Sequence, residues 1–123
     1  MNPVLRVSAL HECDRDILGE LEMRPYRVDQ FKENSKPEIA HFDIGADCSQ
    51  SLATAETAIL EFIRDHAEDF LLLSAIPALR IEIDCPILFG SSFMSKSIRF
   101  GSQTLWMMGQ YRIDLALAIY RST

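Results

Sequence analysis

The chain has 123 residues, with twelve Lys and Arg against eighteen Asp and Glu, which gives a net charge of −6. This length suffices for one domain, residues 1–123, whose core needs neither disulfides nor a structural metal, and a hydrophobic share of 48% excludes global disorder. The acidic balance argues against nucleic acid and against an anionic membrane surface as partners, because both attract clustered Lys and Arg.

The first third of the chain predicts two strands and a short helix. Residues Val4–Leu10 alternate apolar and polar side chains, which is typical of a half-buried strand. Asp14 stands at a predicted helix N-cap, and Pro25 ends that short helix. Residues 26–37 are polar and predict a loop. The stretch Ile39–Ile44 alternates again and predicts a second strand.

The strongest pattern predicts one long helix over Ser51–Leu73. Apolar side chains and one histidine recur at helical spacing on a single face: Ile59, Phe62, Ile63, His66 and Phe70. The charged residues of the same segment are expected to face water: Glu56, Glu61, Arg64, Asp65, Glu68 and Asp69. Pro77 lies at the distance expected after the end of such a helix.

The last third predicts two strands and a helix. Leu79–Cys85 alternates cleanly, and Pro86 is expected to close the regular strand or to force it to an edge. Residues 87–100 predict a flexible turn with a short extended piece near Ile98 to Phe100. Ser102 is expected to cap a helix that ends near Gly109. Arg112–Tyr120 is the final strand, and its inward-facing residues are Ile113, Leu115, Leu117 and Ile119.

The element order β-α-β-α-β-(turn)-α-β predicts an α+β fold. We expect a ferredoxin-like α/β sandwich with a mostly antiparallel sheet and helices on one face. A doubly wound sheet is the alternative, but its strands would be continuously apolar. Strands 79–85 and 112–120 should share one sheet under the helix centred near Phe62. Because no charge lies between Asp114 and Arg121, the final strand should be central, or pair with a second copy if it is an edge.

The cysteines and the absence of targeting segments predict a cytoplasmic protein. Cys13, Cys48 and Cys85 are odd in number and far apart, unlike disulfide frameworks and zinc sites. No stretch approaches the roughly 18 apolar residues of a membrane span, and the first residues lack the apolar region of a signal peptide. We expect reduced thiols, no metal and no other cofactor.

The ends of the chain show a pattern that resembles a known family. The start combines the strand Leu5–Ser8, a short helix and the segment Met23–Val28, and the close combines the helix Leu105–Gln110 with the strand Ile113–Tyr120. This pattern resembles the bacterial domain-of-unknown-function family 4279, which also ends in a helix, a turn and an Asp-containing strand that finishes in Tyr. The glycine and tryptophan that the family carries after the Pro-x-Arg segment are absent from residues 28–40. The resemblance implies a fold and a bacterial source, but no catalytic residue.

The loop Gly45 to Ser51 contains the main candidate site. Asp47, Ser49 and Ser51 match D-x-S-x-S, whose carboxylate and hydroxyl oxygens suit a magnesium-type cation. The same residues before a helix are more simply N-capping residues. Cys48 near a helix N-terminus could be a nucleophile only with a base such as His41, and nothing in the sequence sets their distance.

The remaining polar groups favour structural roles. The run His11 to Asp14 offers three metal ligands, but adjacent side chains cannot all face one ion. His66 is interpreted as a partly buried core histidine. The row Arg80, Glu82 and Asp84, with Arg112 and Asp114, is expected to be a solvated sheet face or a docking surface. Around the third helix, residues 106–111 are expected to pack in the core or to form an interface. No glycine-rich phosphate loop occurs.

The sequence therefore predicts a non-enzymatic binding or protein-interaction module with an accessory or toxin-neutralising role. Its partner would be another protein or a second copy of the chain, as a homodimer; the acidic surface would speed association with a basic partner. The alternative is a small enzyme or cation- or ligand-binding domain whose site is the loop Gly45 to Ser51.

Overall fold

Five strands and four helices make up the described part of the chain, residues 1–30, 38–45, 51–90 and 98–122 of a computed structural model. The strands are β1 Val4–Ala9, β2 Arg27–Asp29, β3 Glu38–Asp43, β4 Leu79–Gly90 and β5 Ile113–Ser122. The helices are α1 Glu12–Glu20, α2 Leu52–Asp65, α3 Ala67–Ser74 and α4 Ser102–Gln110. The predicted α+β class is confirmed.

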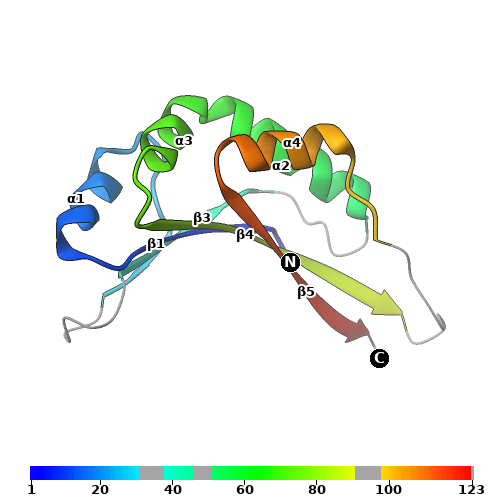
Figure 1. Cartoon of the computed structure of the whole chain (residues 1–123). Coiled ribbons are helices and arrows are strands. Elements are labelled where there is room, and N and C mark those ends of the chain that lie inside the picture. Colours follow the sequence, from blue (N-terminus) through cyan, green and yellow to red (C-terminus); the bar gives the residue numbers. More distant parts are fainter. Residues whose placement is uncertain (31–37, 46–50, 91–97, 123) are drawn as a thin grey trace.

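The strands form one sheet in the order β2-β3-β1-β4-β5. All neighbouring pairs are antiparallel except β4 and β5, which run parallel because α4 connects them. The helices lie together on one face of this sheet (Figure 1). A mostly antiparallel sheet with helices on one face is therefore confirmed, as is the placement of β4 and β5 in one sheet. The ferredoxin-like subtype stays a prediction.

The core lies between the sheet and the helices. The alternation of β1 buries Leu5 and Val7 completely, and their register partners on β3 are Phe42 and Ala40. The helices contribute apolar side chains that are fully buried: Ala55, Ile59, Ile63, Phe70 and Leu73. Alternate side chains of the strands and one face of the helices are apolar, and both pack into a single hydrophobic layer, as their patterns predicted.

The single helix predicted over 51–73 is wrong, because the chain divides it at His66. This residue has φ −116° and ψ 29°, outside the α-helical region, and it separates α2 from α3. The change of direction turns Asp69 inward, where it is 3% exposed, although we expected it to face water. Phe62 is only partly buried, so the centre of the apolar face lies at Ile59 and Ile63 instead.

Three other local predictions are corrected. The polar segment 26–37 contains a short edge strand, β2, which has too few residues to show a pattern. Helix α1 begins at Glu12 after His11, so Asp14 is not its N-cap. Strand β4 continues through Pro86 to Gly90. Proline is tolerated there because the register of β1 with β4 ends at Asp84, so the missing N–H costs no β1–β4 hydrogen bond.

Strand β5 lies at the edge of the sheet, so the prediction of a central final strand is wrong. The helix α4 returns the chain to the outer side of β4, and no described strand pairs with the other side of β5. Together with the second half of β4, β5 projects beyond the helices at the lower right of Figure 1. Leu117 and Ile119, which we expected to face inward, are 39% and 61% exposed as a result.

Candidate functional site

The sheet face opposite the helices, called the open face below, carries a row of polar side chains. The strand register aligns five residues across the sheet in strand order: Arg27, His41, Arg6, Glu82 and Asp114. This arrangement exists because every strand places its polar residues at alternate positions on the same side. The predicted polar sheet face is therefore present, and it extends to β2 and β3. Arg112 is the exception, because it precedes β5 and its Nη2 donates to Ile76 O at 3.1 Å.

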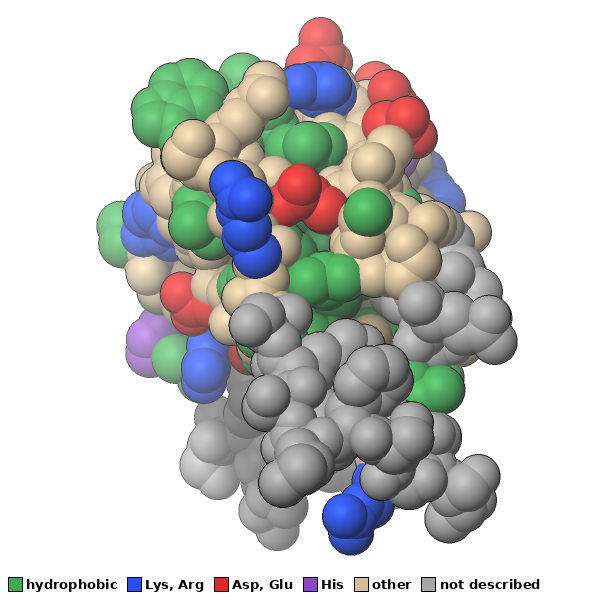
Figure 2. Space-filling model, turned by 90° about the vertical axis from the view of Figure 1, so that its right-hand side faces the viewer, with side chains coloured by type: hydrophobic (Ala, Val, Ile, Leu, Met, Phe, Trp, Pro, Cys, Tyr) green, Lys and Arg blue, Asp and Glu red, His purple; other side chains and the backbone are tan. Residues whose placement is uncertain are grey.

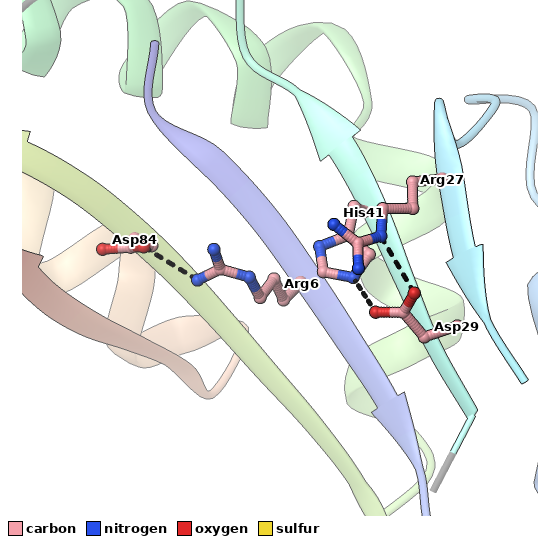
Figure 3. Close-up of polar contacts among 5 residues, drawn as sticks. All are labelled: Arg6, Arg27, Asp29, His41 and Asp84. Atoms are coloured by element: carbon pink, nitrogen blue, oxygen red, sulfur yellow. Dashed lines mark hydrogen bonds and ion pairs between the residues drawn. The ribbon is translucent and has the colours of Figure 1, made fainter. Parts of the chain in front are cut away.

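Two residues of this row, Arg27 and His41, form a three-residue cluster with Asp29 on β2 and β3. Asp29 accepts from Arg27 Nε through Oδ1 and contacts His41 Nε2 through Oδ2, both at 2.9 Å. Figure 3 shows both side chains converging on the Asp29 carboxylate. His41 is 8% exposed, and its backbone carbonyl accepts from Tyr26 N at 2.9 Å. These contacts fasten the short edge strand β2 to β3.

Acid is expected to weaken this cluster. The hydrogen bonds from His41 and then Arg27 hold the pKa of Asp29 below its ordinary value of 3.8. A depressed folded-state pKa contributes stability that is complete above the unfolded value and is lost as the pH falls through the folded one. The unfolding free energy should therefore fall less steeply in Asp29→Asn than in the unmodified protein between about pH 5 and about pH 3. Asp16→Asn replaces an exposed acid on α1 and serves as the control. If it reduced the pH dependence of the unfolding free energy as much as Asp29→Asn, the effect could not be assigned to Asp29.

Charge pairs occupy the rest of the open face. Arg6 Nη1 on β1 donates to Asp84 Oδ2 on β4 at 2.8 Å (Figure 3). Arg80 lies 3.8 Å from Glu82 and 3.9 Å from Asp114, where its side chain is 68% exposed. Such exposed pairs contribute little stability, typically about 0–1 kcal/mol. The Arg6–Asp84 and Arg80–Asp114 contacts match the predicted cross-strand charge pairs, whereas Arg80 and Glu82 lie on the same strand.

The residues at the ends of the loop Gly45 to Ser51 have structural partners. Asp43 Oδ1 accepts from Asn2 Nδ2 at 3.0 Å and from Gly45 N at 2.9 Å. Gly45 has φ +102°, a backbone conformation that favours glycine. The Ser51 hydroxyl accepts from Thr54 N at 3.3 Å as the N-cap of α2, as predicted. Asp47, Cys48 and Ser49, the rest of the predicted cation or nucleophile site, lie outside the described residues.

The other candidate residues are His11, Cys13 and His66. In the ranges for which side chains are placed, no three His, Cys, Asp or Glu residues lie close enough to hold a metal ion. His66 is partly buried, as predicted, with its ring centroid 4.6 Å from that of Phe62. His11 and Cys13 are exposed at the start of α1. A hollow of about 380 Å³ beside Asp43 and Tyr26 is lined mainly by Met1, Asn2 and Val4.

A second candidate surface is the outer edge of β5 together with α4, which the sequence indicated only as the alternative to a central strand and a core helix. Met108 is buried and Tyr111 partly buried, but Leu105 and Trp106 are 51% and 66% exposed, so the core interpretation of Trp106 is wrong. Helix α4 packs on β5. Figure 2 shows hydrophobic side chains at the surface on the side toward which β4 and β5 project, interspersed with charged ones. The uncharged run Leu115 to Tyr120 was the sequence signal for this surface.

Comparison with protein-family models, with curated proteins and with solved structures finds no match to this chain. The resemblance to the bacterial domain-of-unknown-function family 4279 therefore stays a prediction. Among the described helices, none combines the length and apolar character needed to cross a membrane.

Proposed function

We propose that this protein is a non-catalytic protein-interaction module that binds its partner along the outer edge of β5. The observation that carries the proposal is the combination of an edge position with exposed apolar side chains. Ile119 and Tyr120 are 61% and 48% exposed, and Leu117 beside them is 39% exposed. An edge strand presents a row of backbone N–H and C=O groups that another strand can pair with. Adding a strand from a partner satisfies these groups and covers the apolar side chains.

The composition of β5 supports this use of the edge. Proteins commonly protect an edge strand with inward-pointing charges, lysines, prolines or a short length. Between Asp114 and Arg121 this strand has none of these residues, and it extends over ten residues. The opposite edge of the sheet differs, because β2 has three residues and two of them, Arg27 and Asp29, are charged. The two edges thus suggest different roles, with β2 protected and β5 available for binding.

The proposal includes a bacterial cytoplasmic location and an accessory role. Reduced cysteines in an odd, widely spaced set support the location. The net charge of −6 supports a role in which the acidic surface speeds association with a basic protein.

The test is chemical cross-linking of the full-length chain in cells, followed by purification. We expect one cross-linked protein, either another chain or this one, in near-stoichiometric amount. A lysine in the middle of an edge strand opposes strand addition, so Ile119→Lys should reduce this product by at least about tenfold. Val28→Lys is the matched control, because Val28 is an apolar residue on the opposite edge and is 41% exposed. A product unaffected by Ile119→Lys, or no product at all, would overturn the proposal.

A further inference from the structure

We infer that the partner of β5 is a second copy of this chain, joined by antiparallel β5–β5 pairing across a two-fold axis. This inference rests on the proposed function and names its partner. The axis would run perpendicular to the sheet at Leu117, so that the two five-stranded sheets form one continuous sheet. Closed two-fold symmetry uses the same strand in both copies and leaves no further β5 edge exposed.

The residue pattern of β5 is complementary to itself in this register. Directly opposite residues in an antiparallel pair have their side chains on the same face of the sheet. With Leu117 at the centre, the paired segment of each copy runs from Ile113 to Arg121. On the helix side, Leu117 meets Leu117 of the second copy, and Leu115 meets Ile119. These pairs cover the apolar side chains that one copy leaves exposed, and apolar cross-strand pairs stabilise a sheet.

The open-face side of the same register is also compatible. Ala116 lies opposite Ala118 of the second copy, where two small side chains let the backbones approach. Asp114 lies opposite Tyr120, whose hydroxyl is a donor that suits a carboxylate acceptor. On the helix side, the remaining pair is Arg121 opposite Ile113, so no two like charges are directly opposed on either face. This absence of repulsion matters because each chain carries a net charge of −6.

The helices do not oppose this contact. A two-fold axis perpendicular to the sheet keeps the helices of both copies on the same face of the joined sheet. The part of β5 around Leu117 projects beyond the helices, so the edges of two copies can approach each other there (Figure 1).

Sedimentation equilibrium of the purified full-length chain tests the partner. We expect twice the monomer mass of 14.0 kDa. Ile119→Lys should give a monomer with the circular dichroism spectrum of the unmodified protein, since this side chain is 61% exposed and its replacement leaves the core intact. Leu117→Lys should behave in the same way, and Val28→Lys should remain dimeric. A monomer at every accessible concentration, or a dimer that both β5 substitutions leave unchanged, would overturn the inference.

Disulfide trapping tests the register. With Cys13 and Cys48 replaced by Ser, and with Cys85 replaced by Val because it is the register partner of Leu117 on β4, Leu117→Cys should form an intermolecular disulfide. Directly opposite residues of an antiparallel pair have Cα atoms about 4.5–5.5 Å apart. Ala116→Cys is the control, since its symmetry mate is displaced by two residues along the strand and exceeds the disulfide range. An intermolecular disulfide in Ala116→Cys but not in Leu117→Cys would overturn this register.

The two proposals can fail separately. A purified monomer whose cross-linking to a different protein in cells is lost with Ile119→Lys would refute the second copy and retain the interaction module. If the unmodified protein forms no dimer and gives no cross-link that depends on β5, the interaction module is refuted as well.

Discussion

Replacing Phe70 by Ala is expected to lower the free energy of unfolding by about 3–5 kcal/mol, the usual cost of removing a fully buried aromatic side chain. Phe70 is 0% exposed on α3. Its ring centroid lies 6.2 Å from that of Phe62 on α2 and 5.8 Å from that of Tyr111 after α4. The substitution therefore leaves a cavity where three helical segments meet, and chemical denaturation measures the loss.

Two neighbouring substitutions serve as controls for Phe70→Ala. Leu71→Ala removes the adjacent side chain, which is 60% exposed, and should cost less than about 1 kcal/mol. Phe62→Ala should give an intermediate loss, because this ring is partly buried. The sequence alone centred the buried helix face near Phe62, and a loss of about 3–5 kcal/mol would have been expected there if that site were fully buried. Equal losses at Phe62 and Phe70 would contradict the position of the break between α2 and α3.

Replacing Asp69 by Ala is expected to cost about 2–4 kcal/mol, because hydrogen bonds to a charged group contribute about 1.5–3 kcal/mol each. Asp69 is 3% exposed, and its carboxylate accepts from Glu22 N at 3.0 Å and Met23 N at 2.9 Å. It thereby fastens the segment after α1 to α3. Without the carboxylate, the buried Met23 N–H has lost its acceptor, and such an unsatisfied group is costly.

Hydrogen exchange separates this role from a general loss of stability. The Met23 amide should exchange markedly faster in Asp69→Ala under native conditions, while amides of β1 should follow the global unfolding free energy. Asp69→Asn keeps one carbonyl oxygen and should give a smaller loss. Glu68→Ala, the adjacent exposed acid, should change stability by less than about 0.5 kcal/mol. Comparable losses for Glu68 and Asp69 would contradict the anchoring role.

The α+β class and most of the strands were predictable from the residue pattern. Strands β1, β3 and β4 alternate with period two because one sheet face is buried and the other is wet, so local pattern and tertiary environment agree. The N-cap role of Ser51 could also be predicted from the sequence, because capping depends on only a few consecutive residues. The charged row on the open face followed from the same alternation.

The features on which the proposals rest depend on contacts between segments that are distant in the sequence. Strand order depends on contacts between distant segments, so the uncharged run in β5 could not indicate whether the strand is central or an edge. Likewise, Asp69 was expected to face water because the helical pattern contains no information about Glu22 and Met23, whose N–H groups it binds from 47 and 46 residues away, respectively. The Asp29–His41 cluster required the pairing of β2 with β3. Local pattern specifies which face of an element is apolar, whereas the neighbours of that face are set by packing energy over the whole chain.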